Sequence, residues 1–315
     1  MRAERPDPQV EAVVEAIESE GIPEWNAMSV ACARRVEDEV FSPTDSQVPE
    51  LALVRDLAIP GPGGDLPIRV YRSTLDAPAP VVVYFHGGGW VLGTLDSVDG
   101  ICREIAAHTG CVVASVGYRL APEHPFPAAV DDAYAAVEWV ARNAPAVGGD
   151  PDRVAVAGTS AGGNLAAVTA LRAREEPIDG LTLAGQLLLY PITDRAFDTR
   201  SYEENAEGYL LTRADVRWFW DLYLRSSVDA HSPFAAPLRA PDLSGLPPAT
   251  VVTAGFDPLR DEGVAYARRL EESGVDVAHE HYPGMIHGFL SVTDEVDVAR
   301  EAMETVAGQV RAWFE

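Results

Sequence analysis

The sequence predicts an α/β fold with a mostly parallel sheet of eight strands, covered by helices on both faces. Short apolar runs typical of buried strands alternate along the chain with longer segments of helical periodicity. The 315 residues are also enough to bury one large core. The expected strands lie at residues 51–58, 67–72, 80–85, 111–116, 153–157, 183–190, 249–255 and 275–282.

The most informative motif lies just after the expected strand at 153–157. The residues Gly158-Thr159-Ser160-Ala161-Gly162 separate this strand from an Ala- and Leu-rich segment of helical character. A G-x-S-x-G sequence between a strand and a helix is typical of a nucleophile elbow, and its two glycines suit the tight points of the turn. We therefore predict that Ser160 is a nucleophile. The backbone N–H of Ala161, at the start of the helix, should stabilise developing negative charge.

A second motif follows the expected strand at 80–85. This strand runs directly into His86-Gly87-Gly88-Gly89-Trp90. A His-Gly-Gly-Gly turn after an early strand is typical of the oxyanion loop that accompanies a nucleophile elbow. We expect the N–H groups of Gly88 and Gly89 to act with that of Ala161, and we expect His86 to brace the loop.

A nucleophilic serine needs a base, and the base needs an orienting carboxylate. Asp257 follows the expected strand at 249–255 and should share a sheet edge with Ser160. Asp261 is the alternative carboxylate. Together with Glu262, however, it stands where acidic residues support the start of a helix. We therefore favour Asp257.

The base must be a histidine, and we favour His287. The expected strand at 275–282 stops at Pro283-Gly284, so His287 would lie on a loop that can reach Ser160. The alternatives fit other roles. His279 and His281 have the positions of ordinary sheet residues, and His231 lies in a Pro-rich linker.

Taken together, the chain resembles the bacterial hormone-sensitive-lipase family of α/β-hydrolase carboxylesterases, in its GTSAG branch. The resemblance is carried by His86–Gly89, Tyr118–Glu123, Gly158–Gly162, Asp257–Gly263 and His287–Phe289. It implies an α/β-hydrolase fold and a Ser160, Asp257, His287 triad. It also implies an oxyanion hole of Gly88, Gly89 and Ala161.

The resemblance also indicates an activity. We expect hydrolysis of short- to medium-chain acyl esters through an acyl-enzyme, with no metal or organic cofactor. Two alternatives stay open: an amidase or deacetylase that uses the same triad, and a small-molecule-binding protein without activity.

Two segments fall outside the sheet pattern. We expect N-terminal helices at 1–45 and an aromatic-rich insertion at 195–231 to pack together as a helical cap over the catalytic domain of 46–194 and 232–315. The cap should exclude water and help to form the substrate pocket. The expected pocket residues are Trp25, Trp90, Tyr190, Leu210 and Trp218.

The loop at 118–123 contains charged residues that suggest a structural role. Arg119 and Glu123 are candidates for an ion pair that fixes this loop beneath the site. We do not expect either residue to take part in the chemistry.

The charge balance restricts the partners of the protein. The formal net charge is −25, and all 24 basic residues are arginine. Nucleic acid and anionic membranes both require a basic face, so the charge argues against both as partners. High-salt adaptation is one hypothesis for a lysine-free, acidic composition.

Other features bound the location and assembly. Cys32, Cys102 and Cys111 have no metal-binding spacing and form no even disulfide set, so we expect a reducing, cytoplasmic setting. The polar first residues do not resemble a signal peptide, and no apolar run is long enough for a membrane helix. The last strand, 275–282, could join two copies in a homodimer because an edge strand invites pairing.

Overall fold

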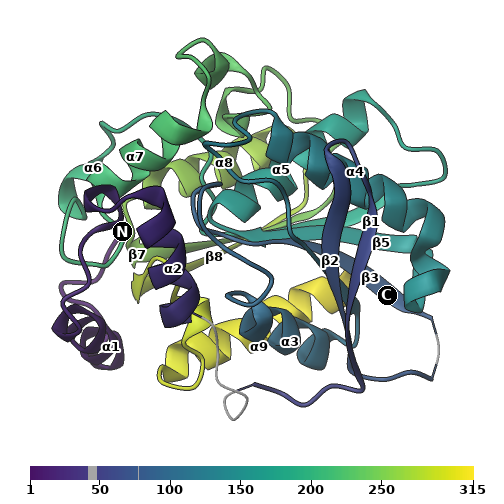
Figure 1. Cartoon of the computed structure of the whole chain (residues 1–315), viewed down its shortest axis with the longest axis horizontal. Helices are drawn as coiled ribbons and strands as arrows, with labels where there is room; N and C mark the ends of the chain where they lie inside the picture. The colour runs from purple at the N-terminus through teal and green to yellow at the C-terminus, as the bar shows by residue number, and fades with distance from the viewer. Residues whose placement is uncertain (42–47, 77) are drawn as a thin grey trace.

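The computed structural model describes residues 1–41, 48–76 and 78–315. Its central element is one eight-stranded sheet (Figure 1). The strands are β1 (Leu53–Gly61), β2 (Gly64–Arg72), β3 (Ala79–Phe85), β4 (Val112–Val116), β5 (Gly149–Thr159), β6 (Leu183–Leu189), β7 (Ala249–Phe256) and β8 (Val277–Ile286). Their order is β1-β2-β4-β3-β5-β6-β7-β8. β2 is antiparallel to both of its neighbours, β1 and β4, and the other pairs are parallel, which confirms the predicted fold class.

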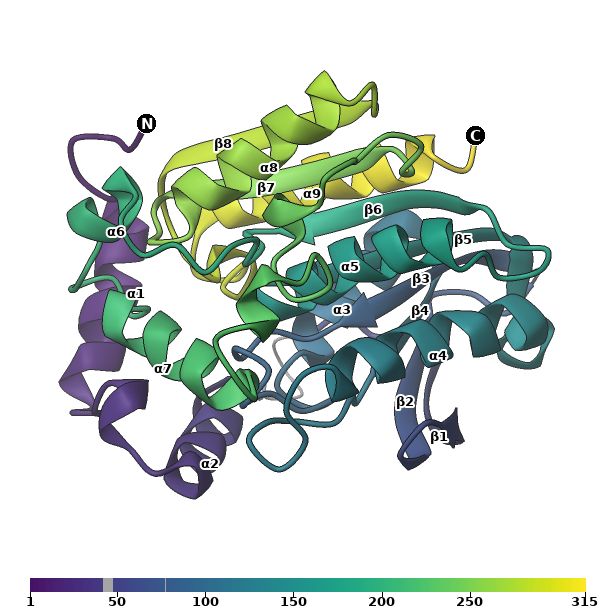
Figure 2. The same cartoon turned by 90° about the horizontal axis from the view of Figure 1, so that it is seen from above.

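Helices cover both faces of the sheet. They are α1 (Pro8–Ser19), α2 (Val30–Phe41), α3 (Asp99–Thr109), α4 (Ala128–Asn143), α5 (Ala161–Glu175), α6 (Arg200–Glu204), α7 (Arg213–Tyr223), α8 (Arg260–Glu272) and α9 (Asp297–Ala312), with the 3₁₀ turns η1 (Trp25–Ala27), η2 (Ala144–Val147), η3 (Asp229–His231), η4 (Pro237–Arg239) and η5 (Phe289–Ser291). Figures 1 and 2 show α4, α5 and α8 on one face of the sheet and α3 and α9 on the other.

The central strands have apolar residues on both faces because helices cover both faces. In β3, Val81, Val83 and Phe85 belong to the core beneath α4 and α5, whereas Val82 and Tyr84 belong to the core beneath α3 and α9. A strand buried on both sides reads as a continuous apolar run, and this is the pattern that made these strands recognisable in the sequence.

The parallel strands bring their carboxyl ends to one edge of the sheet. β3 ends before the oxyanion loop, β5 before Ser160, β7 before Asp257 and β8 before His287. In open α/β sheets this edge is where ligands bind.

The N-terminal helices and the insertion lie side by side over this edge (Figures 1 and 2). The backbone and side-chain amides of Asn26 both donate to Asp215 Oδ1 at 2.9 Å, which ties η1 to α7. Arg2 Nη1 donates to the backbone oxygen of Glu204 at 3.0 Å and so ties the first residues to α6. We use the term cap for residues 1–41 and 195–231; the expected boundary between residues 45 and 46 lies outside the described residues.

The end of the last strand differs from the prediction. We expected the strand to stop before Pro283-Gly284, but β8 continues to Ile286 through a register shift opposite Gly255. β8 is an edge strand with a neighbour on one side only. Pro283 has no N–H to donate, and an edge strand tolerates this because no second neighbouring strand needs that donor. The carbonyl oxygens of Pro283 and Gly284 accept hydrogen bonds from the N–H groups of Ala3 and Asp7, both at 2.9 Å.

The prediction of an ion pair between Arg119 and Glu123 was also wrong. Arg119 donates to the buried carboxylate of Asp132 on α4, with Nη2 to Oδ1 at 2.8 Å. Glu123 instead pairs with Arg34 on α2 at 2.7 Å. Arg119 and Glu123 therefore pair with two different helices, α4 and α2. The positions of these helices beside the loop cannot be inferred from spacing along the sequence.

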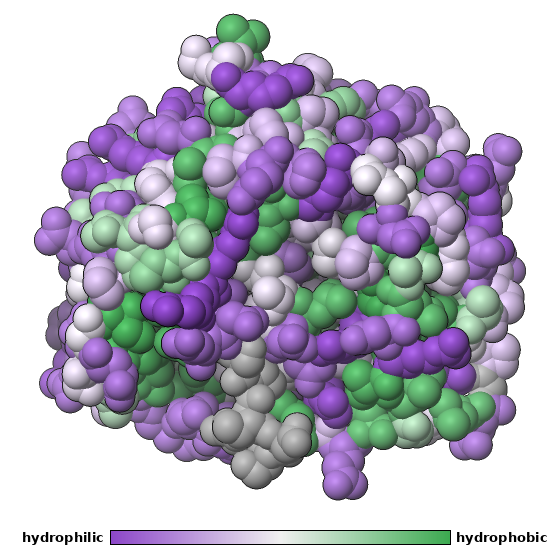
Figure 3. Space-filling model, viewed as in Figure 1, coloured by the Kyte–Doolittle hydropathy of each residue, from purple (hydrophilic) through white to green (hydrophobic). Residues whose placement is uncertain are grey.

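On the face seen in Figure 3, hydrophilic residues are widespread and hydrophobic patches lie between them. Among the described residues, no helix combines the length and the apolar character needed to cross a membrane.

Candidate active site

The nucleophile elbow is a strained turn between β5 and α5. Ser160 has a φ of 56° and a ψ of −115°, a conformation that non-glycine residues rarely adopt. The turn also lies very close to β3, because a Cβ on Gly162 would stand 1.9 Å from the backbone oxygen of Phe85. The strain and the close approach hold Ser160 at the sheet edge, directly before Ala161, the first residue of α5.

The structure brings His287 and Asp257 together. His287 Nδ1 lies 2.8 Å from Asp257 Oδ2, and Asp257 Oδ1 accepts the N–H of Leu259 at 2.8 Å. Because an ionised carboxylate can only accept, Nδ1 carries the proton and Nε2 is free to act as a base. Asp257 is fully buried, so the ring orientation is fixed by a carboxylate that water does not reach.

The alternative acid lies away from the imidazole. Asp261 Oδ2 accepts the N–H of Ser201 at 2.8 Å, and its Oδ1 accepts Arg260 Nε at 2.8 Å. It therefore joins α8 to the cap, as expected of a carboxylate near a helix start.

The alternative histidines are also engaged elsewhere. His279 Nε2 and His281 Nδ1 both lie 2.9 Å from the hydroxyl of Thr253, within the sheet. His231 is exposed, with its Nδ1 3.3 Å from Arg239 Nη1.

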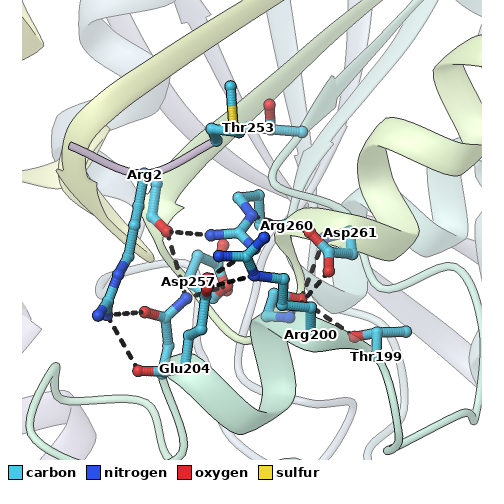
Figure 4. A network of polar contacts seen from close by, with 12 residues as sticks. Arg2, Thr199, Arg200, Glu204, Thr253, Asp257, Arg260 and Asp261 are labelled. Atoms are coloured by element: carbon cyan, nitrogen blue, oxygen red, sulfur yellow. Dashed lines mark hydrogen bonds and ion pairs between the residues drawn. The ribbon is translucent and has the colours of Figure 1, made fainter. Parts of the chain in front are cut away.

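A network of polar contacts holds the backbone that carries Asp257 (Figure 4). The side-chain amide of the buried Asn205, just after α6, donates to the backbone oxygens of Gly255 and Asp257 at 3.2 and 3.0 Å. Arg2 Nη1 in turn donates to Asn205 Oδ1 at 3.1 Å. Arg260 Nη1 supplies a further bond to the oxygen of Gly255 at 3.0 Å. Residues from both cap segments therefore fix the position of the carboxylate.

The oxyanion loop is shaped by glycines and by cap packing. Gly88 and Gly89 have φ values of 97° and 59°, in the region that favours glycine. A Cβ on Gly89 would lie 2.2 Å from the ring of Phe219 on α7. Only a glycine allows the cap to approach the loop this closely.

His86 braces this loop from beneath. Its Nδ1 donates to the oxygen of Gly87 at 2.8 Å, and its ring stacks on Tyr118 with centroids 4.1 Å apart. Tyr118 also donates its hydroxyl to the oxygen of His86 at 2.9 Å. Burial lowers the pKa of His86 to about 4, so its imidazole is neutral at pH 7.

These elements surround one cavity of about 300 Å³ between the cap and the sheet edge. Ser160, His287, Gly88 and Gly89 all line it. Three of the expected pocket residues do so as well: Trp25, Tyr190 and Leu210. Tyr190 packs edge-on against the ring of His287, with centroids 4.9 Å apart.

Two expected pocket residues lie elsewhere. Trp90 is fully buried and stacks on Tyr223, with centroids 4.0 Å apart, so it fastens the oxyanion loop to α7 instead of facing substrate. Trp218 lies outside the cavity lining and packs beside Phe219. The buried face of α7 contains Val216, Phe219 and Tyr223, and Trp218 does not lie on that face.

Two lining residues were missed by sequence reasoning. Phe219 could have been found from the helical phase, because it stands three residues after Val216 on the buried face of α7. Glu37 on α2 gave no signal of its own, because an acidic residue in an amphipathic helix is usually solvated.

Glu37 differs from an ordinary surface carboxylate. Only 9% of the residue is exposed, and burial raises its pKa to about 7. The adjacent Asp38 raises this pKa further, while the Ser97 hydroxyl and the Gly93 amide lower it. Glu37 is therefore present in both protonated and ionised forms near neutral pH.

The described residues contain no group of three or more His, Cys, Asp or Glu side chains placed to hold a metal ion. The site consists of a serine, a histidine, a carboxylate and backbone N–H groups. These are the components of nucleophilic acyl transfer in an α/β-hydrolase.

Comparisons with known proteins agree with this class. A family model for the alpha/beta hydrolase fold matches residues 82–291. The carboxylic ester hydrolase LipN of Mycobacterium tuberculosis is 49% identical over 243 residues, which are 76% of this chain and 65% of LipN. The ethyl acetate hydrolase of Pseudomonas putida is 37% identical over 300 residues, or 93% of this chain and 94% of that enzyme.

The solved structures include a hyperthermophilic esterase from Pyrobaculum calidifontis. It superimposes with a TM-score of 0.92 at 40% identity, covering 98% of each chain. The chain therefore belongs to the hormone-sensitive-lipase family of α/β-hydrolases, a family of carboxylic ester hydrolases.

Replacing Asn205 should reduce turnover. In Asn205→Ala, the backbone that carries Asp257 loses two donors, and we expect kcat to fall about 10- to 100-fold with a smaller change in KM. Asn205→Asp keeps the size but cannot donate, so it should lose activity as well. Steady-state ester hydrolysis gives both constants, and Glu203→Ala on the exposed side of α6 is the control. An Asn205→Asp enzyme with wild-type kcat would show that the donors do not matter.

Glu37 should make folding depend on pH. The folded state holds the Glu37 proton more tightly than the unfolded chain, so the free energy of unfolding falls as pH rises from 4.5 to about 7. The total loss is about 3 kcal/mol. Glu37→Gln should remove this pH-dependent loss. Its free energy of unfolding should therefore increase relative to that of wild type as the pH rises from 5 to 8. Denaturant unfolding at several pH values measures the difference, with the exposed Glu39→Gln as control. A constant difference between Glu37→Gln and wild type across this range would contradict the prediction.

Proposed function

We propose that this protein is a serine carboxylesterase that hydrolyses short- to medium-chain acyl esters through an acyl-enzyme intermediate. The observation that carries the proposal is the 2.8 Å contact between His287 and Asp257, in the same cavity wall as Ser160 and the glycines of the oxyanion loop. Nucleophile, base and the glycines of the oxyanion loop therefore line one space, and the orienting acid lies buried behind the base.

In the first half of the reaction, Ser160 Oγ attacks the ester carbonyl while His287 Nε2 takes its proton. The carbonyl oxygen becomes an oxyanion that accepts hydrogen bonds from the N–H groups of Gly88, Gly89 and Ala161. One such donor is worth about 3–4 kcal/mol in the transition state. The imidazolium is stabilised by Asp257, and it then protonates the leaving alcohol as the acyl-enzyme forms.

In the second half, water takes the place of the alcohol. His287 accepts a proton from the water as it attacks the acyl carbonyl, and the oxyanion returns to the same donors. Collapse of this intermediate breaks the bond to Ser160 Oγ, which regains its proton from His287. The free acid then leaves.

The size of the cavity supports the preference for shorter acyl chains. A volume of about 300 Å³ is at the lower end of the range for small-molecule sites. Its walls include the apolar residues Leu92, Leu210 and Phe219. A relative that covers most of this chain is named for hydrolysis of ethyl acetate, which is a short ester.

We also propose a cytoplasmic location and a homodimer through the β8 edge. The location is supported by the free state of Cys32, Cys102 and Cys111, which suits a reducing compartment. For the dimer, the contacts from Ala3 and Asp7 occupy the end of β8, which leaves the part before Pro283 for pairing.

The esterase proposal is tested with p-nitrophenyl esters from acetate to palmitate. We expect the highest kcat/KM at short chain lengths and at least a 10³-fold loss in Ser160→Ala. The exposed Ser227→Ala should match wild type. A fluorophosphonate probe should label wild type and not Ser160→Ala. Absence of both hydrolysis and labelling in the wild-type protein would overturn the proposal.

The dimer proposal is tested by light scattering coupled to size-exclusion chromatography. We expect twice the chain mass of 33.8 kDa. The assembly should persist at high salt, because strand pairing rests on backbone hydrogen bonds that salt screens weakly. A single-chain mass at every concentration would rule it out.

A further inference from the structure

The Glu37 side chain lines the active-site cavity and carries a polar atom that has no partner. Glu37 lines the cavity with Ser160 and His287, yet it lies on α2 in the cap and has no part in the proposed chemistry. Its Oε2 atom is buried and makes no hydrogen bond of standard geometry among the described residues, although the Ser97 hydroxyl and the Gly93 amide lie close enough to the carboxyl group to lower its pKa. A buried polar atom without a partner is costly and requires an explanation.

Nearby charges do not satisfy this atom. Arg34 on the same helix pairs with Glu123 and donates to the backbone oxygens of Val91 and Ala121. Asp38, the adjacent residue, accepts from the hydroxyl of Thr94 at 2.8 Å and carries the same sign of charge as Glu37. Tyr118, the other titratable group close to Glu37, points its hydroxyl at the oxygen of His86. Among the described residues, Glu37 makes no ion pair.

The surroundings of Glu37 form a polar corner in an apolar wall. Ser97 lines the cavity beside it, and the wall around them is completed by Leu92, Val98 and Val40. The Ser97 hydroxyl already accepts from the N–H of Thr94 at 3.0 Å. The open hydrogen-bonding capacity of this corner therefore belongs to the carboxyl group of Glu37.

We propose that the corner formed by Glu37 and Ser97 is a subsite for a hydroxyl group of the substrate, remote from the ester bond. The enzyme would then prefer hydroxylated esters to alkyl esters of the same length. This inference rests on the esterase function proposed above and adds the polarity of the substrate to it.

A hydroxyl fits this corner better than a cation does. The pKa of about 7 means that Glu37 occurs in both forms near neutral pH. A hydroxyl both donates and accepts, so it pairs with the ionised and the protonated carboxyl. An ammonium group only donates, so it pairs well with the ionised form alone. A site built to bind a hydroxyl also discriminates strongly against the analogue that lacks it.

The test compares esters that differ only in a terminal group. One pair is pentyl butyrate and the butyrate ester in which a hydroxyl replaces the terminal methyl of the pentyl chain. The other pair is ethyl heptanoate and the ethyl ester of ω-hydroxyhexanoic acid. The quantity measured is the ratio of kcat/KM for the hydroxylated ester to that for its alkyl partner. A ratio removes any general change in activity.

We expect wild type to favour the hydroxylated member of one pair. The pair that shows the preference identifies whether the subsite binds the alcohol part or the acyl part of the ester. Glu37→Leu, which has no acceptor, should lower this ratio about 10-fold or more. Glu37→Gln retains a carbonyl oxygen and should keep more of the preference than Glu37→Leu. Glu39→Leu, on the exposed side of the same helix, should leave the ratio unchanged.

The outcomes separate the two proposals. If wild type hydrolyses the alkyl esters with equal or greater kcat/KM in both pairs, the subsite is wrong and the esterase function stands. The same holds if the ratio is unchanged in Glu37→Leu or, should that variant not fold, in Glu37→Ala, which also lacks an acceptor. If wild type hydrolyses none of the four esters, the esterase function itself fails, and the subsite fails with it.

Discussion

The hydrogen bond between Asp257 and His287 is the interaction on which the site depends. It joins the loops after β7 and β8, two neighbouring strands at the edge of the sheet. The buried carboxyl group of Asp257 accepts hydrogen bonds from the N–H of Leu259 and from the imidazole Nδ1 of His287. Burying this carboxyl group has a desolvation cost. Its contact with Nδ1 holds the imidazole in the tautomer that leaves Nε2 free for Ser160.

The cap stabilises this arrangement as well as lining the cavity. Asn205 and Arg2, one from each cap segment, hold the backbone beside Asp257, and Phe219 of α7 packs against Gly89 of the oxyanion loop. A change in the cap would therefore alter the acid and the oxyanion donors together. Glu37 on α2 also lines the cavity, so the cap contributes to the polarity of the cavity wall.

Local motifs predicted the chemical groups of the site, and neighbouring elements decided the pocket. Ser160 and Asp257 follow strands that are recognisable as apolar runs, and His287 follows a strand expected from its alternating pattern. Parallel strands bring their carboxyl ends to one edge. The aromatic residues were harder to place. Trp90 was expected in the cavity, but it stacks on Tyr223 of a helix more than 100 residues away. Similarly, Arg119 found its partner on α4 and not four residues along the chain.

The sequence by itself determined the α/β class, the mostly parallel eight-stranded sheet and the positions of the elbow and the oxyanion loop. These features depend on local periodicity and on glycines whose conformations are dictated within a few residues. The tertiary structure decided which side chains face the cavity, that β8 runs past Pro283, and that Glu37 is a buried carboxyl group at the cavity wall. Such properties arise only when segments far apart in the chain meet, because burial, ion pairing and side-chain orientation are set by the neighbours that packing supplies.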